Sequence, residues 1–185
     1  MKNMRIISGD YKGRTIKAVP GMKTRPTSDK VKESLFNRIG PYFDGGAVLD
    51  LYAGTGNLGI EALSRGCDTC VFIDQSSQAV RVVKHNIKNL GIMKNTEVYR
   101  NDAKRALYIM GNRKRSFDLI FLDPPYAKEQ LSNIVEIIEE QNLLTEEGQI
   151  VCEHHSETVL PEDIQSFRKS QAVTYGDTGI TIYTY

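Results

Sequence analysis

Residues 47–63 read Ala47-Val48-Leu49-Asp50-Leu51-Tyr52-Ala53-Gly54-Thr55-Gly56-Asn57-Leu58-Gly59-Ile60-Glu61-Ala62-Leu63. The first five residues form an apolar run of the length of a buried strand, and the last four continue with helical spacing. The glycines between them allow a tight turn with positive φ and let a ligand approach the main chain closely. The order strand, glycine turn, helix predicts the first unit of an α/β sheet.

The same alternation continues along the chain. Apolar runs of strand length recur between segments with helical spacing. We expect strands at 47–51, 69–74, 96–100, 117–122 and 148–153, and helices at 57–65, 76–90, 103–111 and 129–141. Such alternation is typical of a parallel sheet with helices on both faces. The predicted fold class is therefore α/β and Rossmann-like, with a mostly parallel sheet.

Both ends of the chain depart from this alternation. At the C-terminal end, apolar and polar residues alternate on either side of Gly176-Asp177-Thr178, which is typical of an antiparallel hairpin. We expect an N-terminal hairpin at 4–7 and 15–18, a helix at 28–39, and a C-terminal hairpin at 172–175 and 179–185. The 185 residues suit one domain. We expect a basic N-terminal extension at 1–40 and a catalytic core at 41–185.

Composition favours a cytoplasmic protein. No apolar stretch approaches the roughly eighteen residues that span a bilayer, and the N-terminal residues lack the apolar segment of a signal peptide. Three cysteines, an odd number, favour free thiols. Cys67 and Cys70 form a lone C-x-x-C, so we expect a buried strand residue at Cys70 and no metal site. We interpret His154 and His155 as a solvated pair without a role, and expect a monomer.

Acidic residues end four successive predicted strands. They are Asp50, Asp74, Asp102 and Asp123. Because the carboxyl ends of strands in such a sheet face one crevice, we expect the four carboxylates to meet there. The glycines match G-x-G-x-x-G, which on its own is typical of a dinucleotide site. These acids would repel the phosphates of a dinucleotide, whereas the ammonium and sulfonium groups of S-adenosylmethionine suit them.

The last of these acids begins Asp123-Pro124-Pro125-Tyr126, directly after the apolar run 117–122. The two prolines fix their own φ and restrict the residue before them, so the Asp123 side chain and the Pro124 carbonyl are held stiffly. A planar base with an exocyclic amino group fits this arrangement, since its two N–H bonds have two acceptors and its ring can stack on Tyr126. The alternative interpretation is a strand that ends in a stiff turn.

At this point the sequence resembles a known family. Residues 48–66 and Asp123-Pro124-Pro125-Tyr126 look like the bacterial 16S rRNA guanine-N2 methyltransferases of the RsmD type. The basic N-terminal run and the segment 175–180 are similar to that family too, so the resemblance covers nearly the whole chain. Tyr52 replaces the more usual phenylalanine, and Asn57 replaces a small residue, so these departures concern only cofactor packing.

The resemblance implies a class I S-adenosylmethionine-dependent methyltransferase whose sheet ends in an antiparallel hairpin. It implies methylation of the exocyclic N2 of a guanine, with 16S rRNA or the assembling small ribosomal subunit as partner. The catalytic residues would be Asp123, Pro124, Pro125 and Tyr126. The cofactor-binding residues would be Asp50, Tyr52, Ala53, Gly54, Thr55, Gly56, Gly59, Asp74, Gln75, Asp102 and Ala103. In the family pattern Asp50 and the glycine loop lie near the methionine part, Asp74 at the ribose and Asp102 at the adenine amino group.

Charge is distributed unevenly. Residues 1–40 hold ten Lys or Arg against three Asp or Glu, whereas 41–185 hold fourteen against twenty. This contrast predicts that a polyanion approaches through the N-terminal segment. We expect RNA contacts from Lys12, Arg14, Lys17, Lys23 and Arg25. The alternative is that these charges only solvate the surface.

Four other functions remain open from the sequence. A DNA adenine-N6 methyltransferase or a glutamine-amide protein methyltransferase would use the same amine clamp. A non-catalytic nucleic-acid-binding protein would keep the basic N-terminus, but the intact Asp74 and Asp123 argue against it. A dehydrogenase would keep only the glycine pattern. A specific reader of duplex DNA needs an additional module, for which 185 residues leave little room.

Overall fold

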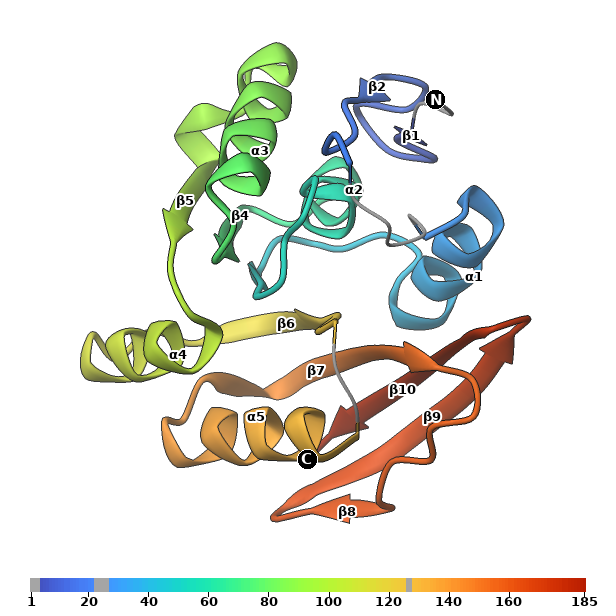
Figure 1. The fold of residues 1–185 in the computed structure, drawn as a ribbon, viewed down its shortest axis with the longest axis vertical. Coiled ribbons are helices and arrows are strands. Elements are labelled where there is room, and N and C mark those ends of the chain that lie inside the picture. Colours follow the sequence, from blue (N-terminus) through green and yellow to red (C-terminus); the bar gives the residue numbers. More distant parts are fainter. Residues whose placement is uncertain (1–3, 22–26, 126–127) are drawn as a thin grey trace.

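The computed structural model describes residues 4–21, 27–125 and 128–185. Its centre is an eight-stranded sheet in the order β5-β4-β3-β6-β7-β10-β9-β8 (Figure 1). The strands are β3 (Ala47–Asp50), β4 (Thr69–Asp74), β5 (Thr96–Arg100), β6 (Phe117–Leu122), β7 (Leu144–His155), β8 (Asp163–Ile164), β9 (Phe167–Tyr175) and β10 (Thr178–Thr184). The pairs among β5, β4, β3, β6 and β7 are parallel, and β10 pairs antiparallel with both β7 and β9. The predicted parallel sheet with a final antiparallel hairpin is confirmed.

Helices cover both faces of the sheet (Figure 1). They are α1 (Asp29–Ile39), α2 (Asn57–Ser64), α3 (Ser77–Leu90), α4 (Ala103–Asn112) and α5 (Lys128–Glu140), with one 3₁₀ turn at Met93–Asn95. Residues of α1, α2 and α3 share one buried apolar cluster, and residues of α4 and α5 share another. Because the central strands contribute to both clusters, they are apolar on both faces, as expected for parallel strands.

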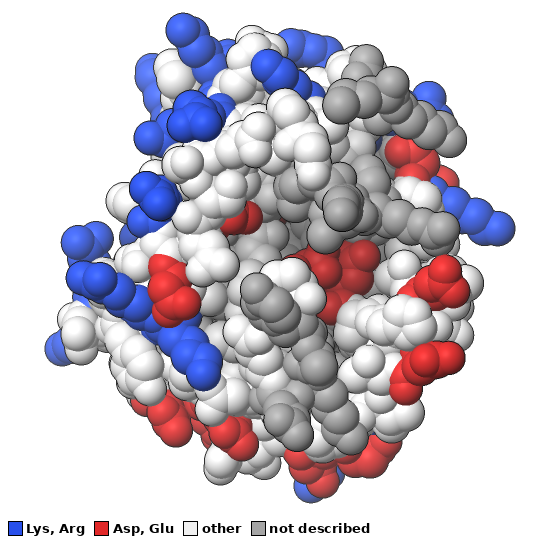
Figure 2. Space-filling model, viewed as in Figure 1, with Lys and Arg blue, Asp and Glu red and all other residues white. Residues whose placement is uncertain are grey.

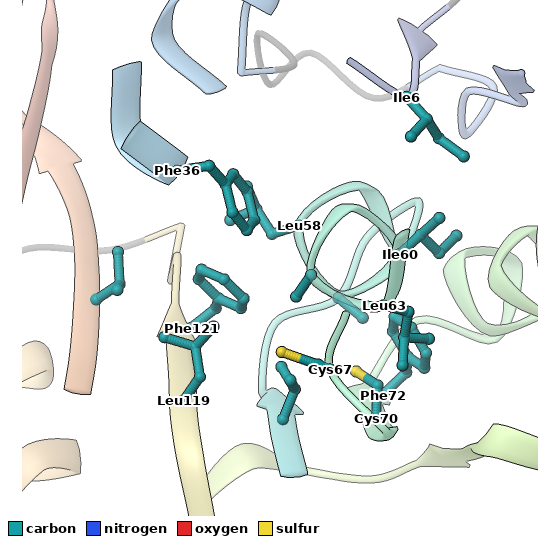
Figure 3. Packing of buried hydrophobic residues seen from close by; sticks show 14 of the residues in the cluster. Ile6, Phe36, Leu58, Ile60, Leu63, Cys67, Cys70, Phe72, Leu119 and Phe121 are labelled. Carbon is teal, nitrogen blue, oxygen red and sulfur yellow. The ribbon is translucent and has the colours of Figure 1, made fainter. Parts of the chain in front are cut away.

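The first cluster is built around α2. Figure 3 shows Leu58 and Leu63 of this helix beside Phe72 of β4 and Phe121 of β6, with Phe36 of α1 at its edge. All five side chains are buried. This packing places the N-terminal end of α2, and the glycine turn before it, at the carboxyl ends of the parallel strands.

The N-terminal segment packs on the same side. Strands β1 (Met4–Arg5) and β2 (Thr15–Ile16) form the predicted hairpin, shorter than expected. Helix α1 begins after Ser28, whose hydroxyl accepts the Val31 N–H as an N-cap. The loop at Gly9 (φ +89°) lies so close to Ser64 of α2 that a Cβ there would meet the Ser64 carbonyl oxygen. The hairpin therefore packs closely against α2.

A buried ion cluster joins these pieces. The Glu61 carboxylate accepts hydrogen bonds from the Ile7 and Ser8 N–H groups of the hairpin at 3.0 and 3.1 Å. It also forms ion pairs with Lys32 of α1 at 3.1 Å and with Arg65 at 2.9 Å. These three charged side chains are at most 2% exposed. One carboxylate therefore connects the hairpin, α1 and α2.

The predicted strand at 148–153 is too short. β7 runs from Leu144 to His155, because β10 pairs with it from His155 back to Ile150 and its first half lies beside β6 with an irregular register. The two-residue β8 was not predicted. No helix in the described part of the chain is long and apolar enough to cross a membrane.

Candidate active site

A cavity of about 1250 Å³ opens at the carboxyl ends of the parallel strands. Asp50, Asp74, Asp102 and Asp123, which follow or end β3, β4, β5 and β6, all line it. The predicted meeting of the four carboxylates in one crevice is therefore confirmed. The cavity lies where the chain order reverses, with β4 and β5 on one side of β3 and β6 and β7 on the other. Typical small-molecule sites occupy about 300–1,000 Å³, so this one has room for a cofactor and a substrate base.

The glycine turn forms one wall of the cavity. Gly54 and Gly56 have φ of +57° and +83°, which favour glycine. The Gly54 N–H donates to Asp74 Oδ2 and the Ser76 N–H donates to Asp74 Oδ1, both at 2.9 Å. Two backbone groups thus fix the Asp74 carboxylate, while each oxygen keeps a further lone pair for a ligand hydroxyl.

Two of the predicted cofactor residues lie behind this wall. Tyr52, Ala53, Gly54 and Thr55 line the cavity, but Gly56 and Gly59 do not. A Cβ on Gly59 would lie 2.5 Å from the Phe72 ring and 2.7 Å from the Cys70 sulfur. Gly59 is required for the close approach of α2 to β4, and its link to the cavity is indirect.

That link runs through Asp50. The Gly59 N–H donates to Asp50 Oδ2 at 3.0 Å, and the Asp50 side chain is 3% exposed. Burial raises the pKa of this carboxyl to about 7, while the Gly59 hydrogen bond acts in the opposite direction. The nearby Asp74 and Glu153 raise it further. A cationic ligand group at this wall would stabilise the ionised form.

Replacing Asp50 with asparagine should therefore stabilise the cofactor-free protein at pH 8. The folded pKa of Asp50 lies above its ordinary value of 3.8, so the folded state binds more protons between pH 4 and 7. The free energy of unfolding then falls as pH rises through this window, by on the order of 4 kcal/mol from this group. Urea unfolding at pH 5 and pH 8 should show a loss in the wild type that is smaller in the variant. Parallel pH dependence in both proteins would contradict it.

The far end of the cavity is formed at β5 and α4. Gln75, Asp102 and Ala103, three of the expected cofactor-binding residues, line it. Asp102 is the N-cap of α4 and accepts the Arg105 N–H at 3.0 Å, which fixes one of its oxygens. Tyr52 also lines this cavity, and its hydroxyl is buried without a hydrogen-bond partner among the described residues. Buried hydroxyls are normally paired, so this atom fits a ligand contact.

Asp123 lies at the opposite end, with Pro124 and Pro125 beside it in the cavity lining. Asp123 is exposed to the open cavity, but the protein atoms around its carboxyl group remove part of its hydration and raise its pKa above the ordinary value, and the charges of Glu153 and Asp50 raise it further. Figure 2 shows Asp and Glu atoms on the floor of a hollow in this face. The predicted stacking residue Tyr126 lies outside the described residues.

Glu153 is a cavity residue that the sequence analysis did not select. Leu122 and Cys152 are register partners in the parallel pair β6–β7, so Asp123 and Glu153 follow as neighbours about 5 Å apart along the sheet. Thr27 Oγ1 donates to both oxygens of Glu153, at 3.2 and 3.0 Å. Burial raises the pKa of Glu153. Glu153 ends a predicted strand, so the signal that selected the other four acids was present here too.

His154 is the second such residue, and its interpretation as solvated is wrong. It is half-buried and lines the cavity. Its Nδ1–H donates to the His155 carbonyl at 2.8 Å, so in the neutral ring Nε2 accepts from the Thr181 hydroxyl at 2.8 Å. A Cβ on Gly179 would lie 2.4 Å from this ring, so the glycine makes room for the histidine. Cys70 is buried in β4, as predicted.

The predicted RNA contacts lie beside the cavity wall. Lys12 and Arg14 lie in the loop between β1 and β2, Lys17 follows β2, and all three are exposed. The Arg14 guanidinium donates to the Asn89 carbonyl of α3 at 2.9 Å. Lys17 is held through its backbone, since its N–H and C=O both bond the Asn86 side-chain amide. Lys23 and Arg25 lie outside the described residues.

Comparison with known proteins gives consistent matches along the chain. Residues 4–184 match the family described as "Conserved hypothetical protein 95". The chain is 53% identical over 180 residues to the Bacillus subtilis protein named "Putative rRNA methyltransferase YlbH", covering 97% of this chain and 98% of that protein. It is 33% identical over 160 residues to the Escherichia coli protein named "Ribosomal RNA small subunit methyltransferase D", covering 85% and 78% of the two chains.

A solved structure matches over a similar range. The Escherichia coli protein named "Putative methyltransferase yhhF" has a TM-score of 0.83 and 29% sequence identity with this chain. The match covers 98% of this chain and 97% of that one. The N-terminal hairpin and the C-terminal strands are thus part of the shared fold.

Proposed function

Because the chain belongs to the family described as conserved hypothetical protein 95, we propose that it transfers a methyl group to the exocyclic N2 of a guanine in small-subunit ribosomal RNA. The relatives named above are described as rRNA methyltransferases, one of them of the small subunit. The choice of guanine follows the family resemblance, and two neighbouring carboxyls in the cavity support it. Which guanine is modified is a question for the experiment below.

The fold is that of class I S-adenosylmethionine-dependent methyltransferases, and S-adenosylmethionine is the cofactor. The cofactor supplies an electrophilic methyl group on a sulfonium. The residues present fit it, because the cavity combines unpaired acceptors for its cationic and hydroxyl groups with the unpartnered Tyr52 hydroxyl. Asp50 would hold the ammonium, Asp74 the ribose hydroxyls and Asp102 the adenine amino group.

Asp123 would orient the reacting amine. The lone pair of an exocyclic nitrogen is delocalised into the ring, which makes it a weak nucleophile. Hydrogen bonds from its N–H groups to the Asp123 carboxylate and the Pro124 carbonyl would fix the nitrogen for attack. Tyr126 would stack on the base, which must leave its helix or loop to reach a closed crevice. Asp123 is exposed toward the cavity, so the proton released from the methylated nitrogen can pass to solvent.

The neighbouring carboxyls Asp123 and Glu153 carry the preference for guanine. Guanine presents two donors side by side, N1–H and the N2 amino group. Adenine and cytosine instead present a ring nitrogen that accepts hydrogen bonds beside their amino group. In its ionised form, Glu153 next to Asp123 offers an acceptor to guanine N1–H and would face the acceptor nitrogen of adenine or cytosine without a proton between them. Because burial raises the pKa of Glu153, this preference for guanine should strengthen as pH rises. This observation supports the guanine enzyme over the DNA adenine-N6 alternative.

The exposed Lys and Arg side chains of the N-terminal hairpin would contact RNA phosphates. Lys12, Arg14 and Lys17 lie on a segment that the Glu61 cluster fixes to the catalytic core. A fixed cation binds a phosphate at lower entropic cost than one on a free chain. The hairpin would therefore set the register of the substrate relative to the cavity.

The proposed function predicts N2-methylguanosine as the product. The purified protein, labelled S-adenosylmethionine, and either a 16S rRNA transcript or isolated small subunits from a strain lacking the enzyme should yield this nucleoside by mass spectrometry. Unlabelled duplex DNA serves as the competing substrate. Label in N6-methyl-2′-deoxyadenosine from the DNA, or in protein glutamine of the small subunits, would overturn the proposal in favour of a rival amino-methyltransferase. A rise in melting temperature with NAD but not with S-adenosylhomocysteine would overturn the cofactor as well.

A further inference from the structure

A second basic region lies outside the N-terminal segment of the sequence. Residues 77–115 hold ten Lys or Arg against two Asp or Glu, a net charge of +8. Residues 116–185 hold three against thirteen, a net charge of −10. Basic charge is therefore not confined to residues 1–40, because the sum over 41–185 cancels two oppositely charged regions.

The Lys and Arg side chains of this region gather along one edge of the molecule. We call the exposed set Arg81, Lys84, Lys88, Arg100, Lys104 and Arg105 the α3–α4 surface. Figure 2 shows Lys and Arg side chains along the edge that holds α3, β5 and α4, and Asp and Glu side chains around α5. β5 is an edge strand of the sheet, so no other strand of residues 4–21, 27–125 and 128–185 covers this side.

The spacing on α3 is regular. Arg81, Lys84 and Lys88 are separated by three and four residues, which places them on one exposed stripe about 10 Å long. The opposite face of α3 is buried through Val80, Val83 and others. Among the described residues, none of the six Lys and Arg side chains of the α3–α4 surface forms an ion pair with a carboxylate. Their charges are therefore available to an external anion.

The surface connects the hairpin to the cavity. At one end, the Arg14 guanidinium of the hairpin lies against the last turn of α3 through its bond to the Asn89 carbonyl. At the other end, Arg100 Nε donates to the Gln75 carbonyl at 3.1 Å, and Lys104 lines the cavity beside Asp102. A polyanion bound to both basic regions would thus pass the mouth of the cavity.

We propose that the α3–α4 surface binds the phosphate backbone of the RNA substrate, as a second contact beside the hairpin. The inference rests on the proposed function, because the site that the surface borders would take a base of that RNA. Two contacts, one at the hairpin and one along α3 and α4, hold a structured RNA in one orientation, which a single contact does not. Counterion release from the bound phosphates would supply the affinity.

Charge removal on the α3 stripe tests this proposal. The variant Arg81→Gln/Lys84→Gln/Lys88→Gln should bind a 16S rRNA transcript more weakly and flatten the log-log salt dependence of binding by up to about three units. Its affinity for S-adenosylhomocysteine should equal that of the wild type, since none of the three residues lines the cavity. The hairpin variant Lys12→Gln/Arg14→Gln/Lys17→Gln should show a separate loss, and the two losses should add.

The matched control removes three exposed charges elsewhere. The control variant is Lys94→Gln/Arg113→Gln/Arg168→Gln. Lys94 precedes β5 and Arg113 follows α4, so both lie at the end of the sheet opposite the cavity. This variant should keep the wild-type salt slope. If the α3 variant kept the wild-type salt dependence of RNA binding, or if the control variant flattened it equally, the proposed RNA contact at the α3–α4 surface would be overturned. Binding of the wild type to vesicles of anionic phospholipid but not to the transcript would overturn it in favour of a membrane.

The outcomes for the two proposals are separable. If the wild type forms N2-methylguanosine but the α3 variant binds RNA normally, the proposed function stands and the proposed RNA contact at the α3–α4 surface is overturned. A wild type that forms no methylated guanosine, but loses RNA binding through the α3 stripe, keeps the surface and removes the guanine assignment.

Discussion

Replacing Asp123 with asparagine should lower the rate of methyl transfer by about 10- to 150-fold while leaving the affinity for S-adenosylhomocysteine nearly unchanged. The physical reason is the loss of a charged hydrogen bond to the reacting amine, worth about 1.5 to 3 kcal/mol. The asparagine amide also presents N–H groups where the amine needs an acceptor. Asp123 lies at the end of the cavity away from Asp74 and Asp102, so the cofactor contacts remain. Single-turnover rates and calorimetric titration separate the two effects.

The control and the pH dependence make this prediction specific. Glu157→Gln removes one carboxylate whose side chain is 90% exposed, and should leave the rate unaltered. In the wild type, the raised pKa of Asp123 means that its carboxylate form, and so the rate, increases with pH. Glu153→Gln removes the charge that helps to raise it, so this increase should move to lower pH. Loss of activity only through weaker cofactor binding would refute the role of Asp123.

The sheet and the position of the cavity could be predicted because both depend on local patterns. Parallel strands buried on both faces read as continuous apolar runs, which located β4 and β6 to the residue. The partly exposed edge strand β5 is not such a run, and the strand–helix alternation located it. The carboxyl ends of such strands coincide in space, so an acid after each strand was enough to place four of the cavity carboxylates. Several predicted helix ends differ from the observed ends by one residue, as expected where capping residues decide the boundary.

What the sequence could not supply depends on distant contacts or on cancelling sums. The polar start of β7 gave no strand pattern because that half pairs irregularly with β6. Glu61 reads as an ordinary residue of an amphipathic helix, since its partners Lys32 and Ile7 lie far away in the chain. Gly59 matched a ligand-binding pattern, although its backbone position is required by packing against Phe72. The positive charge of the α3–α4 surface did not show in the net charge of residues 41–185, because the acidic residues that follow it in the sequence cancel it.

Replacing Glu61 with glutamine should destabilise the protein by about 3 to 5 kcal/mol. The substitution keeps the shape of the side chain but leaves Lys32 and Arg65, both at most 2% exposed, without the carboxylate that neutralises them. The new amide N–H₂ would also face a donor among Lys32 and the Ile7 and Ser8 N–H groups. Urea unfolding followed by circular dichroism measures the loss.

The exposed pair Arg5–Asp29 joins the same two segments and provides the matched control. Its side chains are 65% and 48% exposed, so Asp29→Asn should cost less than about 1 kcal/mol. Burial already lowers the pKa of Lys32, and its attraction to Glu61 opposes this shift. In the Glu61→Gln variant the folded pKa of Lys32 falls further, and the unfolded chain then binds the proton more readily. The deficit relative to wild type should therefore shrink as pH rises toward 10.5, the ordinary value for lysine. A deficit that stays constant with pH would mean that lost packing, and not the unpaired ammonium, destabilises the variant.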